Sequence, residues 1–178
     1  MSRFVAFLRG INVGRRTVKK EKLQEAFSSL GFQNVSTLRQ SGNVIFETDE
    51  TNIEDIESKI EGKLCNAWGY DVAVLVRTVP QLKNLINLEP FRGQDKEGTS
   101  FLVTLLPSKS STFPFQLPFT IPKSSAQIIS AKNTEVFSVT HGGGEGALPN
   151  PFVESKLKVK ATTRNLNIIQ EIVEKYES

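Results

Sequence analysis

A chain of 178 residues with 38% hydrophobic and 23% charged residues can form one domain or two small ones, and it is too apolar to be wholly disordered. It has no apolar run of the roughly 20 residues needed to cross a bilayer, and its first residues lack a signal-peptide cleavage site. One cysteine excludes an internal disulfide, so we expect a soluble protein of the reducing cytoplasm.

The first ninety residues alternate between two kinds of apolar pattern. Apolar and β-branched runs predict strands over residues 3–9, 34–39, 43–48 and 71–77. Helical spacing predicts helices over residues 18–30 and from a capping box at 51–54 to Gly69. The β-α-β-β-α-β order is that of the ferredoxin-like fold, in which the strands share one antiparallel sheet. We therefore expect a ferredoxin-like domain over residues 1–90.

The remaining residues predict a second, smaller α+β lobe over residues 91–178, so the fold class is α+β. Its strands are expected over 101–106, 126–131 and 134–140, after a short helix that ends near Leu88. Two further helices are expected to begin at Asn150 and near Thr162 or Thr163. The proline-rich segment 107–122 is expected to pack on this lobe through its phenylalanines.

The first strand indicates that both faces of its sheet are covered. Phe4, Ala6 and Leu8 share one face, while Val5 and Phe7 share the other. The helices of a ferredoxin-like domain cover one face only. We therefore expect the second lobe, or a partner subunit in a homodimer, to cover the other.

Two polar segments lie where strands begin or end. In the predicted topology, the end of the first strand and the hairpin between the second and third strands share one edge of the sheet. The two segments should therefore meet in space. The candidate ligand-binding residues there are Arg9, Gly10, Asn12, Gly14, Arg39, Gln40, Ser41 and Asn43.

These residue types suit an anionic or polar ligand. Glycine lets a ligand approach backbone N–H groups, arginine offers a charged donor fork for phosphate or carboxylate, and amide side chains can read a base or sugar edge. The spacing matches neither a dinucleotide fingerprint nor a P-loop. A purely structural interpretation also stands, in which Gly42 and Asn43 serve a tight turn.

A third polar segment, Ala161 to Asn165, is expected to open the last helix. Helix N-termini bind anions through free N–H groups, so Thr163 and Arg164 are further candidate ligand-binding residues. The alternative is a threonine cap beside a solvated arginine.

The charge pattern supports an anionic partner, although a solvated surface would explain it equally well. The net charge is only +3, but basic residues gather in two stretches. They are Arg3, Arg9, Arg15, Arg16, Lys19, Lys20 and Lys22 at the start, and Lys156, Lys158, Lys160 and Arg164 later.

Catalytic and metal chemistry find little support in the sequence. The single histidine, His141, precedes three glycines and is expected to be an exposed loop residue. One histidine and one cysteine are too few for a zinc or iron site of the usual kind, and Cys65 is expected to behave as a small apolar residue. The aromatic signature of RNA-recognition modules is missing from the strand 43–48. We predict no cofactor and no metal.

Three segments resemble a bacterial family known as domain of unknown function 1697. Its members share a strand reading ALLRGINVGG, a hairpin reading QSGNVVF and a late ATTRNWNT, which match Phe4–Gly14, Arg39–Phe46 and Ala161–Asn165. The resemblance implies a ferredoxin-like part and a second α+β part. It implies no reaction and no catalytic residues. Arg15, Leu166 and the stretch 146–150 depart from the family pattern, so a shared ligand would be bound differently here.

The leading hypothesis is a protein that binds a phosphorylated or otherwise anionic ligand, a nucleotide or nucleic acid, at the edge of the first sheet. An enzyme acting on such a ligand is the second hypothesis. The third is a structural or interaction protein whose polar cluster locks the two lobes together.

Overall fold

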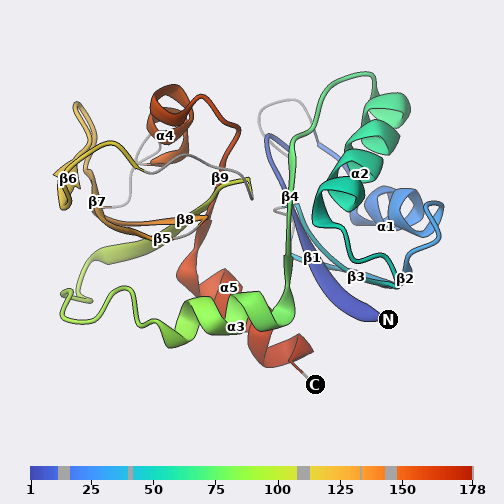
Figure 1. Ribbon diagram of the computed structural model, residues 1–178, viewed down its shortest axis with the longest axis horizontal. Helices are drawn as coiled ribbons and strands as arrows, with labels where there is room; N and C mark the ends of the chain where they lie inside the picture. Colours follow the sequence, from blue (N-terminus) through green and yellow to red (C-terminus); the bar gives the residue numbers. More distant parts are fainter. Residues whose placement is uncertain (12–16, 40–41, 108–112, 133, 143–147, 178) are drawn as a thin grey trace. The chain divides into compact units, whose positions relative to one another are not determined.

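The computed structural model of the protein describes residues 1–11, 17–39, 42–107, 113–132, 134–142 and 148–177. These residues form an α+β fold with five helices and two antiparallel sheets (Figure 1). The chain divides into two compact units, Met1–Leu82 and Lys83–Tyr176. The second unit begins within α3 (Val79–Asn87), so it includes residues 83–90, which the sequence analysis assigned to the first domain.

The first unit contains four strands and two helices in the predicted order before α3. The strands are β1 (Ser2–Leu8), β2 (Gln33–Leu38), β3 (Asn43–Thr48) and β4 (Val74–Thr78), and the helices are α1 (Lys20–Ser28) and α2 (Ile53–Trp68). The sheet order is β2-β3-β1-β4, and every pair is antiparallel. This order is consistent with the ferredoxin-like arrangement, and it sets the end of β1 beside the β2–β3 hairpin.

Side-chain and backbone caps fix both ends of α2. The Asn52 Oδ1 atom accepts hydrogen bonds from the N–H groups of Glu54 and Asp55, at 3.0 and 3.3 Å. The helix ends at Gly69, whose φ of 74° continues the chain in the left-handed region. The predicted capping box placed the cap at Thr51; the cap is Asn52, because its short amide side chain reaches two free N–H groups.

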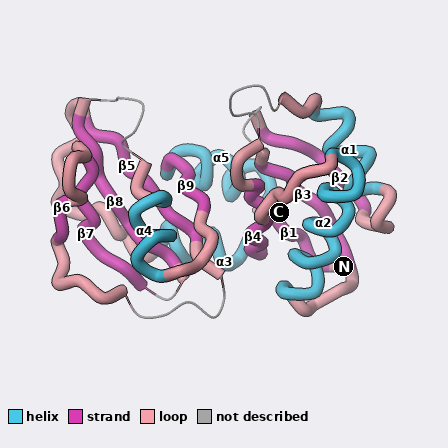
Figure 2. Tube along the Cα trace, turned by 90° about the horizontal axis from the view of Figure 1, so that it is seen from above, coloured by secondary structure: helices cyan, strands magenta, loops and turns pink. Residues whose placement is uncertain are grey.

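The first sheet is buried on both faces, as predicted. Phe4, Ala6 and Leu8 pack against the core that α1 and α2 share, and both helices lie on this side of the sheet (Figure 2). Val5 and Phe7 point to the opposite face and are fully buried as well. At about 25 cal/mol per Å² of buried apolar surface, such a two-sided core supplies most of the stabilisation of the sheet.

The second unit builds a separate five-stranded sheet. Its strands are β5 (Thr99–Leu105), β6 (Phe119–Thr120), β7 (Ala126–Lys132), β8 (Glu135–His141) and β9 (Thr162–Asn165), in the order β6-β7-β8-β5-β9. Helix α4 (Asn150–Leu157) lies on one face of this sheet, and α5 (Leu166–Tyr176) lies on the other (Figure 1).

The phenylalanines of the proline-rich segment pack on the second unit, as predicted for the part that the structure describes. Phe113 contacts the ring of Phe115, which stacks on Phe119 with a centroid distance of 4.4 Å. Phe119 in turn stacks on Phe152 of α4 at 5.6 Å. The rings therefore anchor an otherwise extended loop.

One predicted element was wrong. The last helix was expected to begin near Thr162 or Thr163, but residues Thr162–Asn165 form β9, which pairs with β5, and α5 begins at Leu166. The β-branched pair Thr162-Thr163 favours a strand once a partner strand is available. None of the helices in the described part of the chain has the length and apolar character needed to cross a membrane.

Candidate functional site

The end of β1 and the β2–β3 hairpin meet at one edge of the first sheet. The N–H group of Leu8 donates to the carbonyl of Gly42 at 2.9 Å, and the N–H group of Arg9 donates to the carbonyl of Ala73 at 2.9 Å. A Cβ atom at position 42 would lie 2.4 Å from Cγ2 of Ile11. Since Gly42 also has a φ of 73°, only glycine lets the two segments approach this closely.

Asn43 holds the hairpin from inside. Its side chain is fully buried, and its Nδ2 atom donates to the carbonyl of Leu38 at 3.2 Å. A buried amide left without such a bond would cost about 1–3 kcal/mol. The part of the predicted site formed by Gly42 and Asn43 therefore has a clear structural role.

The other predicted residues of this edge differ in what the structure says of them. Arg9 is half-buried directly after β1, and Gly10 is exposed with a φ of 71°. Arg39 is exposed, with a φ of 55° at the tip of the hairpin. Asn12, Gly14, Gln40 and Ser41 lie outside the described residues.

A cavity of about 490 Å³, here called the hairpin cavity, lies against this edge. It is lined by Thr17, Val18, Lys19, Lys20, Glu21, Leu23, Thr37, Arg39, Gly42 and Asn43. Three of these side chains are cations, and one is a carboxylate. Lys20 lies 3.9 Å from Glu21 as an exposed pair, and such a pair contributes little to stability.

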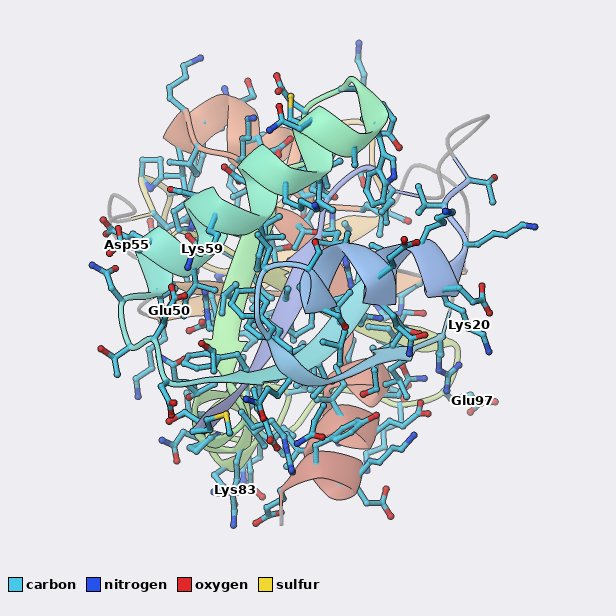
Figure 3. All side chains as sticks on the ribbon, turned by 90° about the vertical axis from the view of Figure 1, so that its right-hand side faces the viewer. Lys20, Glu50, Asp55, Lys59, Lys83 and Glu97 are labelled. Atoms are coloured by element: carbon cyan, nitrogen blue, oxygen red, sulfur yellow. The ribbon has the colours of Figure 1, made fainter. Side chains whose placement is uncertain are left out.

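The start of α1 also lines the hairpin cavity. Lys19 is the N-cap residue, and its side chain makes no capping hydrogen bond. The first N–H groups of a helix have no acceptor within the helix, so they give this end a partial positive charge. Lys20, the first residue of α1, is labelled in Figure 3.

A second cavity of about 730 Å³, here called the helix cavity, lies between α1 and the C-terminal end of α2. Its lining is Thr17, Val18, Lys19, Lys22, Glu25, Ala26, Ser29, Lys63, Ala67, Trp68 and Tyr70. Thr17, Val18 and Lys19 line both cavities. Both cavities therefore border the segment that leads into α1.

The lysines of the helix cavity are unequally paired. Lys22 lies 3.3 Å from Glu25. Among the described residues, Lys19 and Lys63 have no acidic partner, so their charges remain available to a ligand. The same wall carries the aromatic side chains of Trp68 and Tyr70, which are both half-buried.

Thr163 and Arg164 belong to the second unit and do not open a helix, contrary to the prediction. Thr163 Oγ1 shares a 2.8 Å hydrogen bond with Thr104 Oγ1 and donates to Asn150 Oδ1 at 3.3 Å. Arg164 Nη1 donates to Thr162 Oγ1 at 2.7 Å and to the carbonyl of Thr163 at 3.0 Å. Burial lowers the pKa of Arg164 to about 10, which still leaves it charged at neutral pH. Both side chains thus make hydrogen bonds around β9 itself.

Two carboxylates of α2 accept hydrogen bonds from the edge strand β4. Glu57 accepts a hydrogen bond from the N–H of Val76 at 2.8 Å, and Glu61 accepts one from the N–H of Val74 at 2.9 Å. Because β4 is an edge strand, these bonds cover N–H groups that another strand could otherwise pair with. Burial raises the pKa of the Glu57 carboxyl. We assign both residues to structure.

The side chains of His141 and Cys65 both make hydrogen bonds within the fold. His141 is exposed at the end of β8, where its Nδ1 lies 3.0 Å from Thr99 Oγ1. The Cys65 thiol donates to Asp71 at 3.5 Å, and this hydrogen bond raises its pKa, so the reactive thiolate is disfavoured. Within the described residues, no cluster of three or more histidine, cysteine, aspartate or glutamate side chains could hold a metal.

Sequence reasoning missed Lys63, Trp68 and Tyr70 as candidate site residues. Lys19 and Lys20 were noted only as members of a basic stretch, and that stretch was the one signal in the sequence that pointed to them as site residues. Trp68 and Tyr70 gave no separate signal, because Trp68 falls on the apolar stripe of α2 and was expected in the core.

The chain belongs to the family described as "Protein of unknown function (DUF1697)", whose model matches residues 1–137. This finding confirms the resemblance drawn from the sequence. A solved structure described as the conserved bacterial protein SP0830 from Streptococcus pneumoniae is similar, with a TM-score of 0.67 and 18% identity over 100% of this chain and 99% of that one. At this identity the likeness shows the fold alone. No curated protein matches the chain.

Proposed function

We propose that the protein binds a phosphate-bearing or otherwise anionic ligand in the hairpin cavity. The observation that carries the proposal is the lining of this cavity, where Lys19, Lys20 and Arg39 converge from two segments that are distant in sequence. Among the described residues that line it, Glu21 is the single carboxylate. The balance of charge at this surface therefore favours an anion.

The geometry suits phosphate in particular. The Arg39 guanidinium provides a planar donor fork, and the two lysines provide mobile point charges. The start of α1 adds backbone N–H groups that the side chain of its N-cap residue, Lys19, does not cap. The volume of about 490 Å³ lies within the range of roughly 300–1,000 Å³ that is usual for small-molecule sites.

We interpret the first unit as a ferredoxin-like scaffold for this site. Its support is the order β2-β3-β1-β4, which brings the hairpin beside the end of β1. In this interpretation Gly42 and Asn43 hold the hairpin, while Arg39 and the lysines contact the ligand. Arg9 is half-buried at the same edge.

A thermal-shift titration with inorganic phosphate, pyrophosphate and ribose 5-phosphate at low salt tests the proposal. A ligand that binds only the native state raises the melting temperature by mass action, by an amount equivalent to about 2.7 kcal/mol at one hundred times Kd. We expect a rise with at least one of these phosphates. Lys19→Gln combined with Arg39→Gln should abolish it, because both cations are removed.

Lys132→Gln is the matched control, since Lys132 is an exposed lysine of β7 outside the cavity. Equal shifts in this control and in the double variant would contradict the proposal. A structural role for the cluster predicts instead that Arg39→Gln lowers the melting temperature of the free protein and leaves any ligand-induced shift unchanged. Turnover of a bound phosphate ester would add an enzymatic activity to the binding.

A further inference from the structure

We propose that the helix cavity holds the base of a mononucleotide whose phosphate lies in the hairpin cavity. This inference rests on the proposed function, because it takes the phosphate position from it. It adds a ligand class: a planar ring joined to a phosphate through a sugar.

The shared lining of the two cavities is the first argument. Lys19 lines both, together with Thr17 and Val18, so the two cavities border one short segment of the first unit. A ligand restricted to the hairpin cavity would leave the larger space of about 730 Å³ empty.

The aromatic wall is the second argument. Trp68 is the last residue of α2, and Tyr70 follows the cap residue Gly69. Their ring centroids lie 6.3 Å apart with an interplanar angle of 30°. Both side chains pack against the core of the first unit while lining the cavity, so the rings are already held in place before a base arrives.

The charges around this wall are the third argument. Lys63 of α2 and Lys19 before α1 have no acidic partner among the residues that the structure describes. A cavity with planar apolar side chains and available cations matches a nucleotide, which is a stacking ring with an attached anion. A purely apolar ligand would not use the lysines, and a small anion would not use the rings.

Intrinsic fluorescence gives a direct readout, because Trp68 is the single tryptophan of the chain. Fluorescence and thermal-shift titrations would use AMP, ribose 5-phosphate and adenosine as probes. We expect AMP to quench Trp68 and to bind roughly tenfold more tightly than ribose 5-phosphate, in line with the contribution of one base–aromatic stack. Adenosine should bind more weakly than AMP, because it lacks the phosphate.

Variants separate the ring from the phosphate. Tyr70→Leu should reduce the preference for AMP over ribose 5-phosphate and leave the affinity for ribose 5-phosphate unchanged. Trp68→Leu should have the same effect, with binding to this variant measured by thermal shift. Trp68→Phe should keep most of the preference, since it retains a ring and the packing. Lys63→Gln should weaken AMP several-fold, whereas Lys59→Gln, one turn earlier on α2 and paired with Glu50 (Figure 3), should not.

Three results would overturn the inference, and they differ in what they say of the proposed function. Equal affinities for AMP and ribose 5-phosphate, unaffected by Tyr70→Leu, would reject the base site and retain the phosphate site. Failure of inorganic phosphate, pyrophosphate, ribose 5-phosphate and AMP alike would reject both. Binding of a single-stranded oligonucleotide with steep salt dependence, without binding of AMP, would also reject the mononucleotide.

Discussion

The edge of the first sheet and strand β9 both carry threonine and basic side chains, but the two regions use them differently. At the edge of the first sheet, Gly42 and Asn43 hold the hairpin, and the cations Lys19, Lys20 and Arg39 line a cavity. In β9, Thr163 and Arg164 make hydrogen bonds to their own strand and its neighbours. A basic segment becomes a candidate site when its side chains line a cavity, whereas the hydrogen bonds of Thr163 and Arg164 give those residues a structural role in β9.

The largest effect expected concerns the backbone of the hairpin. Gly42→Ala places a Cβ atom 2.4 Å from Ile11 Cγ2, and the alanine must also adopt the φ of 73° that glycine has at this position. We expect the free energy of unfolding to fall by about 2–4 kcal/mol, from crowding and backbone strain together. Urea denaturation of the variant and the wild type measures this change in the free energy of unfolding.

Gly62→Ala is the matched control for this substitution. Gly62 lies inside α2 at an exposed position, and an added Cβ atom meets nothing within 4 Å. Alanine should therefore stabilise the protein by roughly 0.5–1 kcal/mol. Equal effects at both positions would show that Gly42 does not hold the hairpin against Ile11.

The second prediction compares two residues of one hairpin: Asn43, which stabilises the hairpin, and Arg39, which is proposed to contact the ligand. Asn43→Ala should cost about 1–3 kcal/mol of stability, because the Leu38 carbonyl loses its buried donor. Arg39→Gln should change stability by less than about 0.5 kcal/mol, as is usual at an exposed position. Chemical denaturation of the two variants side by side gives the difference. A larger loss for Arg39→Gln would place Arg39 in the scaffold.

The third prediction addresses β9. Thr163→Val keeps the shape of the side chain and removes the hydroxyl that bonds Thr104 and Asn150. We expect a loss of about 1–2 kcal/mol in stability and no change in the phosphate-induced thermal shift. If this variant lost the phosphate response while keeping its stability, the ligand site would have to include β9.

The smallest effect concerns pH. The pKa of Glu57 is raised above its usual value of 4.5 by burial, against the opposing effects of the Val76 N–H group and Arg77. The native state therefore holds this proton more tightly than the unfolded state. Its contribution to stability is complete below pH 4.5 and declines as pH rises through the higher native pKa.

Glu57→Gln removes this titration and keeps an acceptor for the Val76 N–H group. The melting temperature of the variant relative to the wild type should therefore increase as pH rises above 4.5 and through the raised native pKa. Because other carboxyl groups titrate in both proteins, the difference between the two curves is the quantity to compare. A constant difference would show that Glu57 ionises normally.

Local patterns were sufficient for most of the fold. Strand and helix periodicities report which side of each element is buried, and this information lies within a few neighbouring residues. The order from β1 to β4 and the burial of Val5 and Phe7 were therefore readable from the sequence. The wrong prediction of a helix start at Thr162 also came from relying on local patterns. The local sequence there fits both a strand and a helix start, and only pairing with the distant strand β5 decides for the strand.

The candidate site depended on distances that the sequence does not record. The sequence by itself determined the α+β class, the family and the convergence of the two polar segments, because these follow from periodicity, motif residues and strand order. Only the tertiary structure decided that Asn43 faces inward, that Thr163 and Arg164 serve β9, and that Lys63, Trp68 and Tyr70 share a cavity with the start of α1. The physical reason is that a side chain's role depends on which donors, acceptors and rings from distant segments surround it.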